Sequence, residues 1–293
     1  MNAAAERKVG IVIVNWNLAD DTLACLDSVW AMDYPNFEAV VVDNGSTDGS
    51  VERIAAAHPQ TALIANGQNL GFAAGANKGI EWTLERDCAY VLVLNNDTTV
   101  APDLLDLLVA ASETDARIGI LSPRILYFDQ PERTWHLAAR WHRWLPMPVH
   151  IWQASNAIVE ADFVSGCAMM LRREALEQVG AFDPQYFMYG EDVDLCIRAR
   201  AAGYRIVAVP QARIWHKVSL SAAKVSSETR YWQTRNQIRA YRFHLTGARR
   251  TLLPGYVLTK ALLDVVRHLA QGRSDQIRPL LRGVRDGLWG PLL

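Results

Sequence analysis

The stretch YVLVLNNDTT, residues 90–99, decides the fold. Its apolar run, Val91–Leu94, is short, and it lies between two segments of helical periodicity, which is the pattern of a buried strand in a parallel sheet. The run stops at Asn95, so we expect Asp97 at the carboxyl edge of the sheet, where open α/β sheets bind ligands. A carboxylate there can bind a divalent cation that in turn binds phosphates. Alternatively, Asn96 and Asp97 only start a turn or cap the next helix.

Further apolar runs of the same kind accompany this one, and helical patterns separate them. They cover residues 9–14, 37–42, 62–65 and 118–121. This β-α-β-α-β-α-β-α-β order predicts an α/β fold, with a mostly parallel central sheet, right-handed crossovers and flanking helices. Gly71, Gly75 and Gly79 are four residues apart, so in a helix they share one face and allow another backbone to approach closely.

The composition is that of a folded chain with an unequal charge distribution. Half of the 293 residues are hydrophobic and 21% are charged, which favours one large domain with an appendage. Residues 229–293 hold twelve Lys or Arg against three Asp or Glu, a balance of +9, so residues 1–228 carry −10 of the overall −1. A basic tail on an acidic body predicts that the tail faces something anionic.

The cysteines and the apolar segments indicate a cytosolic protein. Four cysteines lie far apart with no C-x-x-C pair, which predicts reduced core thiols at Cys25, Cys88, Cys167 and Cys196. Residues 1–8 are polar and the run 9–14 is too short for a signal peptide. Charged residues interrupt the longest apolar candidate, residues 256–270, so we expect no spanning helix.

The second half of the chain is less regular. Residues 128–161 contain four tryptophans, Trp135 to Trp152, and three prolines, and we interpret them as a long irregular excursion or a hairpin. A strand is expected over residues 163–171, followed by helices at 173–179 and 190–202 and a strand at 204–209. From Ser226 helical periods dominate, and we expect breaks at Gly247, Gly255, Gly272 and Pro279.

Polar residues end three of the expected strands. Asn15, Asp43 and Asp97 should therefore project from the same edge of the sheet. Neither the G-x-x-x-x-G-K-[ST] phosphate loop nor the G-x-G-x-x-G dinucleotide motif occurs, so a nucleotide would be bound mainly by side chains and a metal. Asp43 can bond a base N–H or a ribose hydroxyl, or it can bond the backbone of its own turn.

Three acids open the helix expected from residue 190. Favourable interaction with the helix dipole and an i,i+4 pair with Arg198 explain Asp194 well, but they explain Glu191 and Asp192 less well. A carboxylate near aromatic surface can act as a general base. Past the last strand, His216 is a candidate metal ligand, although a single histidine is more often structural.

Taken in order, these segments resemble family 2 glycosyltransferases with the GT-A fold, in particular the rhamnosyltransferase-like branch. The resemblance covers about residues 9–245. The matching segments are residues 12–17, 42–49, 69–77, 94–98, 165–169, 190–195, 215–216 and 231–236. The resemblance implies a GT-A catalytic domain over residues 1–222, with a nucleotide-sugar half to about residue 126 and an acceptor half from 127, and a basic amphipathic helical extension over 223–293.

The resemblance also implies donor-side roles. Asp43 would contact the donor base, and Asn15 would line that pocket. Asp97 stands at the last acid of the D-x-D motif and would bind Mg²⁺ or Mn²⁺ with the diphosphate, with His216 as a further metal ligand. Asn95 replaces the first acid of that motif, which lowers the charge of the metal site. The remaining donor-side residues would be Gly71, Asn77 and Asn96.

On the acceptor side, the resemblance makes Asp192 the catalytic base beside Glu191, with Gly166 and Trp215 shaping the acceptor site. It implies an inverting transfer, with L-rhamnose from dTDP-L-rhamnose as the best choice of sugar, to a glycan or polyprenyl-diphosphate-linked saccharide in cell-surface polysaccharide synthesis. Galactofuranosyl or other hexosyl transfer is the alternative. A nucleotidyltransferase should show a Gly-rich basic loop after the first strand, and a non-catalytic nucleotide-sugar binder would need no Asp192.

The basic tail has two interpretations. Its arginines can face an anionic membrane, at the inner face of the cytoplasmic membrane, or its helices can pack on the enzyme or on a second copy in a homodimer. We expect no nucleic-acid partner, because the charge is scattered through helices and the body is acidic. The residues in question are Arg230, Arg235, Arg239, Arg242, Arg249 and Arg250, among Trp232, Tyr241, Phe243 and Leu252.

Overall fold

The structure is a computed structural model, and it describes residues 7–152, 156–218 and 226–290. Its strands are β1 (Val9–Asn15), β2 (Phe37–Asp43), β3 (Ala62–Ala65), β4 (Tyr90–Asn95), β5 (Thr98–Val100), β6 (Ile118–Tyr127), β7 (Thr134–His136), β8 (Ala138–Trp141), β9 (Pro148–Ile151), β10 (Val159–Ala161), β11 (Ala168–Arg172) and β12 (Arg205–His216). Its α-helices are α1 (Ala19–Trp30), α2 (Ser50–Ala57), α3 (Phe72–Leu84), α4 (Leu104–Ser112), α5 (Arg173–Val179), α6 (Glu191–Ala201), α8 (Ser227–His244), α9 (Gly247–Ala270) and α10 (Ile277–Trp289).

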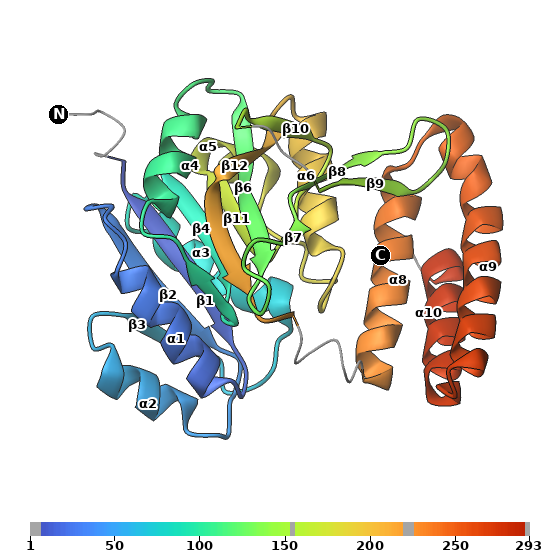
Figure 1. The fold of residues 1–293 in the computed structure, drawn as a ribbon, viewed down its shortest axis with the longest axis horizontal. Helices are drawn as coiled ribbons and strands as arrows, with labels where there is room; N and C mark the ends of the chain where they lie inside the picture. The colour runs from blue at the N-terminus through green and yellow to red at the C-terminus, as the bar shows by residue number, and fades with distance from the viewer. Residues whose placement is uncertain (1–6, 153–155, 219–225, 291–293) are drawn as a thin grey trace.

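Ten strands form one mixed sheet in the order β10-β12-β6-β11-β4-β1-β2-β3, with β5 beside β12 and β7 beside β6 (Figure 1). The strands β4, β1, β2 and β3 run parallel to one another, and β6 runs parallel to β12. Between these groups, β11 pairs antiparallel with both β4 and β6. The predicted α/β fold with a mostly parallel sheet and flanking helices is thereby confirmed.

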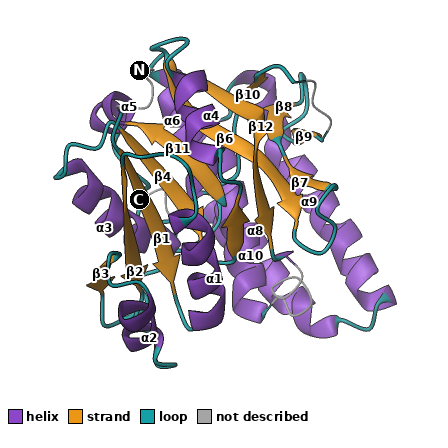
Figure 2. Ribbon diagram, turned by 60° about the vertical axis from the view of Figure 1, so that its left-hand side comes forward, coloured by secondary structure: helices purple, strands orange, loops and turns teal. Residues whose placement is uncertain are grey.

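The sheet has a hydrophobic core on each face, and Figure 2 shows helices on both sides of it. Because side chains alternate along a strand, Leu92 and Leu94 of β4 face the core under α1 and α4, while Val91 and Val93 face the core under α3, α5 and α6. The strand is buried on both sides, which explains why its sequence is continuously apolar.

The glycine-spaced segment is a helix, as predicted. A Cβ at Gly79 would lie 2.2 Å from a methyl group of Val12, and one at Gly75 would lie 2.9 Å from the side-chain amide of Asn44. These two glycines therefore let α3 lie directly on β1 and on the loop after β2. Gly71 precedes the helix at φ +82°.

Several boundaries differ from the sequence expectation. An Asp at position 20 or 21 of the sequence is a candidate cap for the first helix, but both residues lie in the first turn of α1, whose N-cap is Leu18 with no side-chain cap bond. Gly255 does not end a helix, because α9 continues for 24 residues through Pro254 and Gly255. The last strand runs to His216 rather than to residue 209.

The tryptophan-rich segment includes an antiparallel hairpin, β8–β9, so the hairpin alternative was the right one. The helices α8, α9 and α10 lie beside this hairpin, at the end of the molecule away from α1 and α2 (Figure 1). They share a third core with Tyr186, which precedes α6. The predicted domain boundary at residues 222 and 223 lies outside the described residues. In the described part of the chain, none of the helices combines the length and hydropathy needed to cross a bilayer.

Candidate active site

The carboxyl ends of β1, β2 and β4 meet in a buried hydrogen-bond network. Asn15 pairs in register with Asp43, and its Nδ2 donates to Asp43 Oδ2 over 2.7 Å. Asn15 Oδ1 accepts from Thr22 Oγ1 over 2.8 Å and from Asn96 Nδ2 over 3.3 Å. The structure therefore brings together three of the predicted donor-side residues at one edge of the sheet, as the strand order implies.

Hydrogen bonds inside the protein hold the side chain of Asp43 in place. Its Oδ1 accepts from the backbone N–H of Gly45 and Ser46 at 3.0 and 2.8 Å, and the residue is only 2% exposed. Both interpretations of Asp43 therefore remain: it closes its own turn, and Oδ2 keeps one lone pair beyond the bond from Asn15. Direct contact with a donor base stays a prediction.

Asp97 and His216 come together from different parts of the chain. The turn after β4 carries Asp97, and β5 then pairs with β12 so that Thr98 lies opposite His216. His216 Nε2 is 3.1 Å from Asp97 Oδ1. Burial acts to lower the pKa of His216, but its neighbours Cys167 and Asp97 outweigh burial and raise that pKa to about 10. Because burial also raises the pKa of the Cys167 thiol, Asp97 is the charge that holds the imidazolium at neutral pH.

This pair fits part of a divalent-cation site. Asp97 Oδ1 and His216 Nε2, 3.1 Å apart, share a proton here, and a cation bound by both would replace that proton. No cluster of three or more His, Cys, Asp or Glu suited to a metal occurs among the described residues. The donor set therefore matches Mg²⁺ or Mn²⁺ that binds through one or two protein groups and completes its shell with substrate phosphates and water.

Asp192 lies in the first turn of α6, and backbone N–H groups hold its carboxylate. Gly166 N donates to Oδ2 over 2.9 Å and Val193 N donates to Oδ1 over 2.8 Å. Burial raises the pKa of Asp192, and these two hydrogen bonds offset the rise only in part. A carboxylate with a raised pKa is a better general base than a free aspartate.

Glu191 is in a different environment from its neighbour. It is 6% exposed, and within the described residues its Oε2 has no hydrogen-bond partner. Burial, and then the charge of Asp192, raise the pKa of Glu191 well above the ordinary value. This rise favours the neutral carboxyl, which cannot accept a proton, whereas two backbone N–H groups stabilise the carboxylate of Asp192; among these two acids, Asp192 is therefore the better candidate for the base.

A short backbone path joins the two halves of the site. Gly166 contacts Asp192, and the next residue, Cys167, accepts a hydrogen bond from Asn95 N over 2.9 Å through its carbonyl. Cys167 also lies next to His216. Asp192 and the Asp97–His216 pair are therefore linked through the two backbone residues Gly166 and Cys167.

The loop before α6 is fixed from two sides. Phe72 N donates to Phe187 O over 2.7 Å, and a Cβ at Gly71 would lie 2.3 Å from that same oxygen. From the C-terminal helices, buried Asn236 donates to Met188 O over 2.9 Å. Because Gly71 has no side chain, the loop before α6 can pack against the N-terminus of α3. The family resemblance places the donor near this end of α3.

Asn77 also acts on this region through backbone. Its Nδ2 donates to Phe182 O over 2.7 Å, and its Oδ1 accepts from Phe182 N over 3.1 Å. Both ends of the amide are therefore used within the protein, which gives Asn77 a positioning role. A donor contact by Asn77 stays a prediction.

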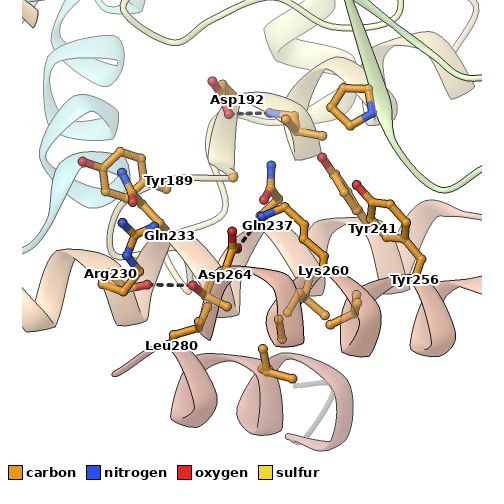
Figure 3. Close-up of a pocket in the computed structure, with 18 of the residues that line it drawn as sticks. Tyr189, Asp192, Arg230, Gln233, Gln237, Tyr241, Tyr256, Lys260, Asp264 and Leu280 are labelled. Atoms are coloured by element: carbon orange, nitrogen blue, oxygen red, sulfur yellow. Dashed lines mark hydrogen bonds and ion pairs between the residues drawn. The ribbon is translucent and has the colours of Figure 1, made fainter. Parts of the chain in front are cut away.

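A cavity of about 560 Å³ opens beside Asp192, between the start of α6, the strand β9 and the C-terminal helices. Figure 3 shows Asp192 on one side of it, Gln237 and Lys260 opposite, Tyr189 at one end, and Tyr241 and Tyr256 at the other. Aromatic faces with amide and charged groups suit a saccharide. Asp43, Asp97 and His216 do not line this cavity.

The two predicted acceptor residues differ in position. Gly166 lies against Asp192, since a Cβ there would be 3.2 Å from Asp192 Cβ. Trp215 is next to His216 on β12, so its side chain points to the opposite face of the strand, and its Nε1 donates to Pro131 O over 3.2 Å. Trp215 does not line the cavity, and its acceptor role stays a prediction.

Sequence reasoning missed most of the cavity wall. The signal was the spacing of polar and aromatic residues on α8, which falls on one helical face. These residues are Arg230, Gln233, Gln237 and Tyr241, and α9 adds Tyr256, Lys260 and Asp264.

The mixed α/β sheet with polar residues at its carboxyl edge is a GT-A fold, the fold of many glycosyltransferases. The sequence profile described as "Glycosyl transferase family 2" matches residues 10–180, and the chain belongs to this family. A profile described as "N-terminal domain of galactosyltransferase" matches residues 150–220.

The chain is similar to N-acetylglucosaminyl-diphospho-decaprenol L-rhamnosyltransferase of Mycobacterium tuberculosis, at 30% identity over 216 residues that cover 63% of this chain and 68% of that protein. It is 26% identical to the low-salt glycan biosynthesis hexosyltransferase Agl10 of Haloferax volcanii, covering 96% of this chain and 91% of that one. The mannosyltransferase PcManGT of Pyrobaculum calidifontis, solved with GDP-Man and Mn²⁺, shares the fold with a TM-score of 0.60 and 18% identity, over 98% of this chain and 88% of that one.

Proposed function

We propose that this glycosyltransferase transfers a hexosyl group, L-rhamnose from dTDP-L-rhamnose in the first instance, with inversion to a hydroxyl of a polyprenyl-diphosphate-linked saccharide. The observation that carries the proposal is the position of Asp192. Its carboxylate faces a cavity of saccharide size, and the Gly166–Cys167 backbone connects it to Asp97 and His216. The proposed base, Asp192, and the proposed site of the leaving diphosphate, at Asp97 and His216, thus lie on opposite sides of Gly166. This arrangement suits a single displacement.

In this mechanism the acceptor hydroxyl lies in the cavity, and Asp192 takes its proton. The oxygen attacks the anomeric carbon from the side opposite the diphosphate, the new C–O bond forms, and the bond to the diphosphate breaks. Asp97 and His216 would hold a divalent cation, which would supply positive charge for the leaving diphosphate. The N–H groups of Gly166 and Val193 hold Asp192 in place throughout.

The choice of donor and acceptor follows from the relatives. The Mycobacterium tuberculosis relative is by name an L-rhamnosyltransferase acting on a diphospho-decaprenol-linked N-acetylglucosamine. The profile match to a galactosyltransferase domain over residues 150–220 favours galactosyl transfer, including galactofuranosyl transfer, as the second candidate. Residues 150–220 include Gly166, Asp192 and His216, so both candidates use the same site.

The test is a panel of nucleotide sugars, including dTDP-L-rhamnose and UDP-galactofuranose, with a lipid-diphosphate-linked N-acetylglucosamine acceptor and Mg²⁺ or Mn²⁺. We expect release of nucleoside diphosphate with one donor, raised by the acceptor, and a product whose anomeric configuration by NMR is opposite to that of the donor. Retention of configuration would refute the single displacement. Release of pyrophosphate from a nucleoside triphosphate would indicate a nucleotidyltransferase.

A further inference from the structure

The helix α9 exposes an apolar face to solvent. Along its outer side the side chains of Leu258, Leu262, Leu263, Val266 and Leu269 are 49–64% exposed. Leu253, Val257 and Ala261 of the same helix are buried in the core of the C-terminal helices. At 100° per residue, the exposed set lies opposite the buried set, so this helix is apolar on both faces.

The exposed set is continuous along the helix. With Leu252 included, it runs for about 26 Å at 1.5 Å per residue, over nearly five turns. We call the six side chains the outer α9 face: Leu252, Leu258, Leu262, Leu263, Val266 and Leu269. In Figure 1, α9 is the outermost element at this end of the molecule. A single exposed leucine needs no explanation, but six on one unpartnered face indicate a binding surface.

The charge around this face is positive. Exposed Arg267 and Lys260 flank it on α9, and Lys260 pairs with Asp264 at 2.8 Å. The neighbouring α10 exposes Arg278, Arg282 and Arg285 with Leu281 and Trp289, and Asp286 pairs with Arg282 and Arg285. These five cations outnumber the two acids, so the net charge of this part of α9 and α10 is positive. Of the earlier arginines of the tail, Arg250 is exposed, but those of α8 are held within the protein. Arg239 is 4% exposed and donates to Gln185, and Arg242 is half-buried and donates to Gly290 O. From the sequence, residues 230–252 were expected to face an anionic surface. In the structure, α9 and α10 are the better candidates for that role.

We propose that the outer α9 face lies in the headgroup region of an anionic lipid bilayer, with its leucines among the acyl chains and the flanking cations at the lipid phosphates. An apolar helical face with basic residues at its edges is the arrangement of interfacial membrane helices. Each cation near an anionic surface contributes to binding, and exposed Arg267 borders the outer α9 face on the same helix. A second copy of this chain on the same face would bring two basic flanks together, which disfavours a homodimer there.

This placement relates the membrane to the cavity. Lys260 and Asp264 of α9 line the cavity that holds Asp192, whereas Leu262 and Leu263, between them on the helix, face outward. One helix thus forms both the cavity wall and the lipid contact. The lipid-linked acceptor would then be taken from the same bilayer, and only this last step rests on the proposed function.

The test is flotation of the full chain with phosphatidylcholine vesicles, with and without phosphatidylglycerol. Leu262→Gln removes apolar surface from the outer α9 face and should weaken binding to the anionic vesicles about tenfold or more. Leu18→Gln is the matched control, because Leu18 is 45% exposed and lies far along the chain in the loop before α1. Val266→Gln repeats the test, and melting temperatures equal to that of the unchanged protein show that the variants fold.

The expected result is binding that needs phosphatidylglycerol, falls in Leu262→Gln and Val266→Gln, and persists in Leu18→Gln. Equal binding by all variants, equal binding to neutral vesicles, or no binding would overturn the proposal. Sedimentation velocity tests the alternative that the outer α9 face is a dimer interface. A dimer that dissociates in Leu262→Gln, together with no binding to vesicles, would support that alternative and overturn the proposal. None of these readouts uses turnover, so failure of the proposed reaction would leave them interpretable.

Discussion

Gly166 offers a way to move the proposed base without removing it. An alanine Cβ at this position would lie 3.2 Å from Asp192 Cβ and 3.6 Å from its Oδ2. The first distance is tighter than an ordinary contact, so Asp192 must shift by a few tenths of an ångström, and the 2.9 Å bond from Gly166 N lengthens. The φ angle of Gly166 is not in the left-handed region, so alanine can adopt the same backbone conformation.

Two effects on catalysis follow. A misplacement of 1 Å can reduce a rate about 10²-fold, so a few tenths of an ångström should reduce kcat about threefold to tenfold. The lost hydrogen bond favoured the charged carboxylate, so weakening it raises the pKa of Asp192 further. A base works only when deprotonated, so the acid limb of the rate profile should move to higher pH and the loss should be greatest at low pH.

The assay is the pH dependence of kcat and kcat/KM with the best donor from the panel. Gly255→Ala is the control, since nothing lies within 4 Å of a Cβ there, and its profile should match that of the unchanged protein. A Gly166→Ala enzyme with an unchanged acid limb and an unchanged kcat would refute the assignment of Asp192, because the contact would then have no effect on the chemistry.

Three further predictions concern other parts of the molecule. Burial acts to raise the pKa of Asp194, but His244, at 2.7 Å, and Arg198 lower that pKa overall. The stabilisation that these two partners give is therefore present above about pH 4 and is lost as the pH falls. His244→Ala should lower the free energy of unfolding at neutral pH by roughly 1–3 kcal/mol and make it depend less on acid pH; equal denaturant midpoints for the variant and the unchanged protein would contradict this. Asp97→Ala should abolish the Mn²⁺-dependent part of nucleoside-diphosphate binding in calorimetry, and a persistent Mn²⁺ effect would remove Asp97 from the metal site. Gln237→Leu should raise the acceptor KM about threefold to tenfold with the donor KM unchanged, and a change confined to the donor KM would contradict the cavity assignment.

The local elements were largely predictable from the sequence, but their neighbours in space were not. The apolar run Val91–Leu94 marked a doubly buried strand because both faces of β4 are covered. Nothing in Ala168–Arg172 shows that β11 inserts antiparallel between β4 and β6, since apolar pattern identifies a strand but not its partners. Gly255 was expected to end a helix, but α9 packs Leu253 and Val257 into a core, which outweighs a glycine cost of about 1 kcal/mol.

The site shows the same division. Asn15 and Asp43 follow adjacent parallel strands, so their contact could be expected from strand order alone. The approach of His216 to Asp97 depends on the three-residue strand β5, which is too short to recognise in the sequence. Gln237 was missed because a helix face reveals its partner only once the helix is placed against the catalytic domain.

The most direct test of the central claim is a comparison of two isosteric changes in neighbouring acids, Asp192→Asn and Glu191→Gln. Donor binding is measured by calorimetry and sugar transfer by single turnover. The proposed mechanism predicts that Asp192→Asn binds donor normally but transfers sugar about 10²–10⁴-fold more slowly. Glu191→Gln, at a carboxyl whose pKa burial raises well above the ordinary value, should lose little. Transfer by Asp192→Asn at the rate of the unchanged protein, or the large loss in Glu191→Gln instead, would contradict it.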